Sequence, residues 1–91
     1  MPRMRPQLRP GDRERLACCL RLSLHALYRA AERGVSLTDI QFVLRHGAVR
    51  PTWRGLRFRL SPAQRSARPA VTRLVVIVDL EFRIPTIYWE D

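Results

Sequence analysis

Residues 70–80, AVTRLVVIVDL, are the most apolar run of the chain, and the rest of the fold is predicted outward from them. β-Branched residues dominate this run, which is long enough for a central strand and must lie in the core. Before it, residues 56–60, LRFRL, alternate apolar residues with Arg57 and Arg59. This alternation predicts a second strand that has one buried face and carries its arginines on the outside.

Flanking segments complete an antiparallel meander. Residues 49–55 contain a strand start followed by the turn sequence PTWRG. A tight turn after the apolar run leads into residues 86–89, TIYW, where alternation places Trp89 and Tyr88 on opposite faces. Residues 61–69, SPAQRSARP, have two prolines and two serines, so we predict a loop there.

The N-terminal half has helical patterns. In residues 12–22, DRERLACCLRL, Asp12 is predicted to cap a short helix. In residues 24–33, apolar positions recur at helical spacing, which predicts a helix that starts at Ser23 and ends at Gly34. The apolar stripe predicted to face the core consists of Leu24, Leu27, Tyr28 and Ala31.

Residues 36–47 contain a further helix with a clear start. Ser36 and Asp39 match the Ser-x-x-acid signature of a helix N-terminus, and Gly47 follows the last turn. Its inward face is predicted to consist of Leu37, Ile40, Val43 and Leu44. Together these patterns predict an α+β domain with two or three N-terminal helices packed on a three- to four-stranded antiparallel sheet.

One domain accounts for most of the 91 residues. We assign it to residues 12–91. Residues 1–11, MPRMRPQLRPG, hold three prolines and three arginines with little to bury, so we predict a flexible arginine- and proline-rich arm.

Composition favours a polyanionic or acidic partner. All 17 basic residues are arginine, against eight acids, which gives a net charge of +9. Such a charge favours nucleic acid or an acidic protein, and the planar fork of arginine suits phosphate contacts. No segment approaches the ~20 apolar residues of a membrane span. No spacing of histidine and cysteine predicts a metal site, and no glycine-rich loop predicts a cofactor.

Two adjacent cysteines, Cys18 and Cys19, are the only ones in the chain. Neighbouring cysteines have poor geometry for an ordinary disulfide, so we predict two buried free thiols. The lack of a disulfide framework favours a cytoplasmic protein.

A stripe of charged side chains marks the helix predicted at residues 24–33. His25, Arg29 and Arg33 recur at i, i+4 and i+8, so one helix face combines a proton-transfer group with two permanent cations. This stripe could contact a phosphate. The alternative is an ordinary charged face in water.

The same segment carries a resemblance to a known family. Residues 25–36, HALYRAAERGVS, resemble the opening motif H-A-x-x-R-x-x-x-R-G-(aliphatic)-Ser of a bacterial domain-of-unknown-function family related to the BrnT and RelE/ParE toxins. Residues 39–47 are similar to that family's second helix, and the strand at 74–78 followed by TIYW resembles its closing hairpin. The resemblance implies a barnase/EndoU/colicin/RelE-like fold, a metal-independent ribonuclease scaffold and a toxin–antitoxin setting.

RNA cleavage would need a general base, a general acid and cations beside the phosphate. His25 is the candidate for either proton transfer, because imidazole titrates near neutral pH. Arg29 and Arg33 are candidates for phosphate contacts, and Tyr88 or His46 for the second proton transfer. A structural role is the alternative for each, such as a backbone hydrogen bond for His25 or sheet packing for Tyr88.

Two other function classes stay open. In a non-catalytic nucleic-acid-binding module, Arg54, Arg57 and Arg59 would bind the backbone while Trp53 stacks on an unpaired base. In a basic interaction or inhibitor protein, encoded for example by a phage or plasmid, the arginines would meet an acidic protein such as an antitoxin. The apolar last strand would also allow a homodimer through strand pairing.

Overall fold

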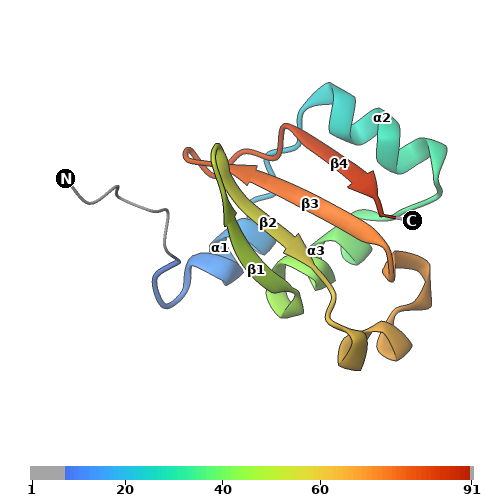
Figure 1. The fold of residues 1–91 in the computed structure, drawn as a ribbon. Helices are drawn as coiled ribbons and strands as arrows, with labels where there is room; N and C mark the ends of the chain where they lie inside the picture. The colour runs from blue at the N-terminus through green and yellow to red at the C-terminus, as the bar shows by residue number, and fades with distance from the viewer. Residues whose placement is uncertain (1–7, 91) are drawn as a thin grey trace.

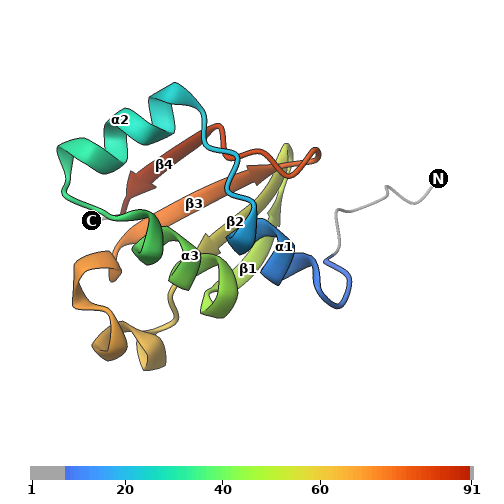
Figure 2. The same cartoon turned by 180° about the vertical axis from the view of Figure 1, so that it is seen from behind.

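Residues 8–90 are described by the structure, a computed structural model, apart from the side chains of residues 66, 67 and 70. Within this range, three α-helices precede a four-stranded antiparallel sheet, which confirms the predicted α+β class (Figure 1). The three helices lie on the same side of the sheet (Figure 2). One face of the sheet is therefore packed against helices, and we call the opposite side the outer face.

The sheet is an antiparallel meander in the order β1-β2-β3-β4, as predicted. β1 (Ala48–Thr52) and β2 (Gly55–Arg59) form a hairpin through Trp53 and Arg54. β3 (Leu74–Asp79), from the most apolar run of the sequence, lies between β2 and β4 (Thr86–Trp89). Its two paired neighbours and the helices behind it explain why nearly every β3 residue is apolar.

Gly55 allows the β1–β2 hairpin to join β3 closely. A Cβ atom at this position would lie 2.1 Å from the carbonyl oxygen of Val78, and the φ angle is 156°. Any side chain would therefore push the two strands apart, so glycine fixes the start of β2.

The core lies between the sheet and helices α1 and α3. α3 (Leu37–His46) begins with the predicted capping box, in which the Ser36 hydroxyl accepts from the Asp39 amide at 3.1 Å. Leu37 is 51% exposed, so its predicted place in the core was wrong. As the first helical residue it precedes the turns that contact the sheet. The buried residues of α3 and the sheet include Ile40, Val43, Leu44, Leu56, Phe58, Leu74, Val76, Val78 and Ile87.

α1 (Asp12–Cys18) is shorter than the helix predicted over residues 12–22. Gly11, with a φ of 88°, occupies the N-cap position in place of Asp12. The Asp12 carboxylate instead accepts a hydrogen bond from the Arg9 amide at 2.7 Å. The chain beyond Cys18 does not continue the helix, because Leu22 instead forms a bridge with Ile84 at the entry to β4.

The N-terminal segment is only partly described. Of the arm predicted over residues 1–11, residues 1–7 lie outside the described part of the chain. Leu8, within the predicted arm, is partly buried and packs against the core.

Both cysteines are exposed, and the prediction that they are buried was wrong. Leu16 and Ala17 occupy the inward positions of α1 instead. The Cys18 thiol donates to Glu14 Oε1 at 3.1 Å, and this hydrogen bond raises the pKa of the thiol. Arg45 on α3 donates to both Glu14 oxygens at 2.9 and 2.8 Å, which lowers the pKa of Glu14 and links α3 to α1.

α2 (Leu24–Glu32) starts and stops as predicted. The Ser23 hydroxyl accepts from the Ala26 amide at 3.0 Å, and Gly34, with a φ of 67°, follows the last turn. The Gly34 and Val35 amides donate to the carbonyls of Ala31 and Ala30, the hydrogen-bond pattern of a Schellman motif.

The orientation predicted for α2 was wrong. Ala26 and Ala30 are buried, whereas Leu24 is 74% exposed and Tyr28 is 70% exposed. The small alanines allow α2 to lie close to β4. The side with the most hydrophobic residues therefore faces water.

Residues 61–69 were predicted to be a loop, but they contain short helices. η1 (Pro62–Ala67) and η2 (Pro69–Val71) are 3₁₀ helices that each begin with proline, which loses no hydrogen bond at that position. Gln64 forms hydrogen bonds with Ser61 at the start of η1, and Arg68 forms an ion pair with Asp39 of α3 at 2.9 Å. With these contacts, the segment forms short helices where its two prolines had predicted a loop.

None of the helices within residues 8–90 has both the length and the apolar character needed to cross a membrane.

Candidate nucleic-acid interface

Two rows of side chains cross the outer face of the sheet. In the first row, Arg50 lies opposite Arg57, Arg57 opposite Ile77, and Ile77 opposite Thr86. In the second row, Arg59, Val75 and Tyr88 lie side by side on β2, β3 and β4. Strand geometry separates the rows by about 6.7 Å, or two residues. Residues far apart in the sequence therefore present three guanidinium groups and a phenol on one surface.

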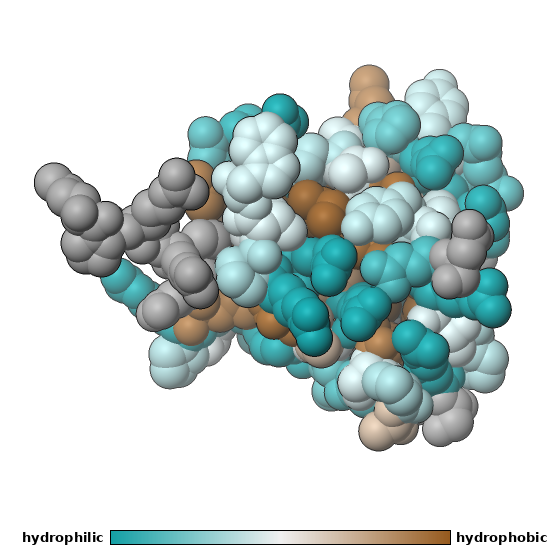
Figure 3. Space-filling view, viewed as in Figure 1, coloured by the Kyte–Doolittle hydropathy of each residue, from teal (hydrophilic) through white to brown (hydrophobic). Residues whose placement is uncertain are grey.

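Val75 shows how the arginines are supported. It is fully buried, yet it lies outside the main core, on the outer side of β3. Its cross-strand neighbours are Arg59 and Tyr88, whose apolar stems can cover it while their polar ends stay in water. Viewed from this side, hydrophilic side chains surround a smaller hydrophobic area (Figure 3). Val75 thus places a buried apolar residue between Arg59 and Tyr88 in the second row.

Glu90 partly neutralises the outer face. Its carboxylate lies 2.8 Å from Arg59 and 3.9 Å from Arg57, and all three side chains are about one-third exposed. Arg50 is exposed, and no carboxylate lies within ion-pair distance of it among residues 8–90. The face therefore keeps a positive charge after its own ion pairs are counted.

Trp53 and Arg54 form the tip of the β1–β2 hairpin beside the arginine rows. Trp53 is 85% exposed, and the Arg54 guanidinium lies 4.0 Å from the centre of its indole. A ring this exposed contributes little to the core, so its flat surface is open for stacking on a base. The four predicted binding residues, Trp53, Arg54, Arg57 and Arg59, thus all come from β2 and the turn before it.

The predicted catalytic residues lie in two different environments. Arg29 and Arg33 point to Trp89, and their guanidinium carbons lie 6.0 and 4.7 Å from its ring centre. His25 is exposed on the first turn of α2. Tyr88 lies on the outer face, whereas Trp89 and α2 are on the helical side of the sheet. Arg29 and Arg33 thus both lie near the Trp89 ring, and Tyr88 is on the other face of the sheet.

His46 is the other residue considered for proton transfer. It ends α3 and is exposed, with its ring 4.7 Å from the Phe42 ring. Its carbonyl accepts a hydrogen bond from the Gln64 side chain. These contacts are those of a helix C-terminus.

Sequence reasoning missed two residues of the outer face. Arg50 is predicted within a strand but not within a site, although a two-residue turn at Trp53 and Arg54 would place it opposite Arg57. Glu90 had no comparable signal, because its contacts with β2 depend on how β4 pairs with β3.

Comparisons of the chain with models of protein families, with curated proteins and with solved structures find no match.

Proposed function

We propose that the protein binds single-stranded RNA on the outer face of its sheet. The observation that carries the proposal is the arrangement of Arg50, Arg57, Arg59 and Tyr88 in two neighbouring rows on a face without helices. Arginines bind phosphates through charge-assisted hydrogen bonds, and aromatic rings stack on bases that are not paired. The net charge of +9 would also speed the approach of a polyanion.

Spacing on the strands supports an extended strand of RNA. Arg57 and Arg59 are two residues apart on β2, so their side chains leave the same face about 6.7 Å from each other. Tyr88 lies two strands away from Arg59 in the same row. A phosphate chain that follows β2 would therefore hold its bases toward the aromatic side chains of the face.

The test is a salt titration of binding. We expect labelled single-stranded RNA to bind the wild type with an affinity that falls as salt rises, with about 0.7 in the log–log slope for each phosphate contact. The variant Arg57→Gln/Arg59→Gln should bind more weakly and with a slope lower by about 1.4. The matched control Arg9→Gln/Arg15→Gln removes the same charge from α1, where Arg15 lies, and from beside α1 and the end of α3, where Arg9 lies.

Equal losses in the two double variants would mean that only net charge matters, and would refute an interface on the outer face. Single-stranded DNA of the same sequence tests the nucleic-acid class. Tighter DNA binding would contradict the assignment to RNA.

Cleavage is a separate proposal, motivated by the sequence resemblance to a family of unknown function related to the BrnT and RelE/ParE toxins. End-labelled RNA in EDTA, with and without ribosomes, would be incubated with the wild type and with His25→Ala. Loss of cleavage in His25→Ala with unchanged RNA affinity would support a metal-independent ribonuclease that uses His25. Intact RNA with the wild type would leave binding as the function.

A further inference from the structure

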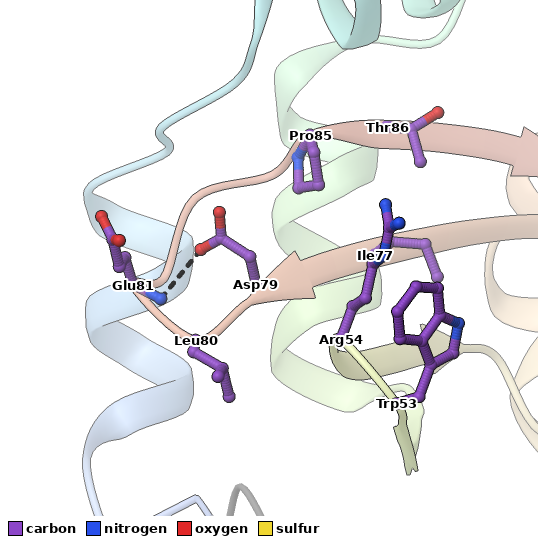
Figure 4. A pocket seen from close by; sticks show the side chains of 8 residues that line it. All are labelled: Trp53, Arg54, Ile77, Asp79, Leu80, Glu81, Pro85 and Thr86. Carbon is purple, nitrogen blue, oxygen red and sulfur yellow. Dashed lines mark hydrogen bonds between the residues drawn. The ribbon is translucent and has the colours of Figure 1, made fainter.

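A pocket opens beside the hairpin tip on the outer face. It encloses about 560 Å³, a volume within the range of small-molecule sites. Its walls include Trp53 and Arg54 from the hairpin, Ile77 and Asp79 from β3, and Leu80 and Glu81 from the following turn (Figure 4). We call it the Trp53 pocket.

Flat and apolar groups dominate one side of the Trp53 pocket. The indole of Trp53 and the guanidinium of Arg54 are planar groups on which a base can stack. Leu80 is 69% exposed and adds apolar surface to the pocket wall. The pocket thus offers apolar surface to a flat ring, and burial of that ring would also cover Trp53 and Leu80.

Hydrogen-bond acceptors line the other side. Asp79 uses one carboxylate oxygen to accept from the amides of Glu81 and Arg83, both at 2.9 Å. Its other oxygen points away from Glu81 and lies 3.6 Å from Arg83 Nε (Figure 4). The Glu81 side chain is 68% exposed, and its Oε2 accepts a hydrogen bond from Arg83 Nη2. Arg83 thus pairs with both carboxylates, and the remaining oxygens, Asp79 Oδ2 and Glu81 Oε1, can accept hydrogen bonds from an amine.

The pocket adjoins the arginine rows. Ile77, in its wall, lies directly opposite Arg57 on the neighbouring strand, about 5 Å away at the backbone. A nucleotide with its phosphate at Arg57 could therefore extend its base into the Trp53 pocket. This step rests on the proposed function.

We propose that the Trp53 pocket receives one unpaired nucleobase that bears an exocyclic amine, stacked on Trp53 or Arg54 with its amine toward Asp79 and Glu81. Cytosine and uracil make the sharpest comparison. They have the same size, but cytosine carries an amine donor where uracil carries a carbonyl acceptor.

The experiment measures fluorescence anisotropy with labelled oligocytidine and oligouridine of equal length. We expect the wild type to bind oligocytidine about fivefold more tightly than oligouridine, since a hydrogen bond to a charged acceptor distinguishes them. Trp53→Ala should weaken oligocytidine binding about tenfold and leave the salt slope unchanged. Tyr28→Ala is the matched control, because Tyr28 is an exposed aromatic residue on α2.

Asp79→Asn and Glu81→Gln test the acceptors. The substitution Asp79→Asn keeps one acceptor oxygen for the turn amides, so the fold should persist while the preference for cytosine falls. Near-equal binding of the two oligonucleotides by the double variant would support the proposal. A preserved fivefold ratio would overturn the role of the carboxylates.

Failure of the pocket and failure of the proposed function give different results. If Arg57→Gln/Arg59→Gln weakens binding but Trp53→Ala does not, the outer face binds RNA without the pocket, and this inference is wrong. If neither variant changes binding, both proposals fail. Equal affinity of the wild type for oligocytidine and oligouridine overturns the amine preference.

Discussion

Glu90→Gln should tighten RNA binding. The Glu90 carboxylate contacts Arg59 at 2.8 Å and Arg57 at 3.9 Å, so it competes with RNA phosphates for the same guanidinium groups. Glutamine keeps the size of the side chain and removes its charge. Two arginines are then free for phosphate, and the net charge rises by one.

The expected gain follows from the position of Glu90. A unit charge about 6 Å from a phosphate contributes roughly 0.7 kcal/mol in water-like surroundings, so its removal should lower the Kd about threefold. If one more phosphate contact forms, the salt slope should rise by about 0.7. The cost in stability should be below about 1 kcal/mol, because the ion pair is partly exposed and screened.

The assay is an anisotropy titration of single-stranded RNA at several salt concentrations, with unfolding in urea as a check on stability. Glu32→Gln is the matched control, because Glu32 is an exposed acid on α2 and its loss changes the net charge equally. An affinity for Glu90→Gln that is unchanged, or no better than that of Glu32→Gln, would refute the competition between Glu90 and phosphate.

Three further predictions concern the fold. Gly55→Ala should lower the free energy of unfolding by at least about 1 kcal/mol in urea titrations, since the new Cβ would collide with the β3 backbone; an unchanged midpoint would contradict the packing at Gly55. Ala30→Leu should lower the melting temperature through an overpacking cost of about 1–3 kcal/mol, whereas Leu24→Gln should have little effect; the opposite order would mean that α2 packs with its apolar stripe inward. Because the pKa of Glu14 is lowered in the folded state, its contribution to stability is present above its ordinary pKa and is lost as pH falls through the folded value. Between neutral and acidic pH, the urea midpoint of Glu14→Gln should therefore change less than that of the wild type. The same pH dependence in both proteins would exclude the Arg45 contact as the cause.

Local patterns predicted most of the sheet and the helix ends. The alternation of residues 56–60 fixes which side chains leave each face, and the β3 sequence has no polar residue before Asp79. The Ser36–Asp39 capping box needs only residues three apart in sequence. Such features depend on near neighbours, so a sequence contains all the information that they need.

The side on which α2 packs could not be derived in the same way. Its hydrophobic pattern is strong, but the pattern does not say which side meets another element. The guanidinium groups of Arg29 and Arg33 lie near the ring of Trp89 on β4, and the two buried alanines allow α2 to approach β4 closely. This contact joins segments from opposite ends of the chain, and it outweighs burial of the leucines.

The same difference between local and tertiary information separates the two groups of candidate site residues. Grouping of Trp53 and Arg54 with Arg57 and Arg59 follows from one hairpin, so sequence reasoning could find it. Grouping of His25 with Tyr88 required α2 to lie on the outer face, which depends on tertiary packing.

The two tryptophans give this protein two separate optical reporters. Trp53 stands in water at the hairpin tip, so an aqueous quencher such as iodide should reach it readily. Trp89 packs against the core beneath two guanidinium groups, where its emission senses the contact between α2 and β4. Because neither ring lies in the environment of the other, one spectrum follows the surface and the interior of the molecule at the same time.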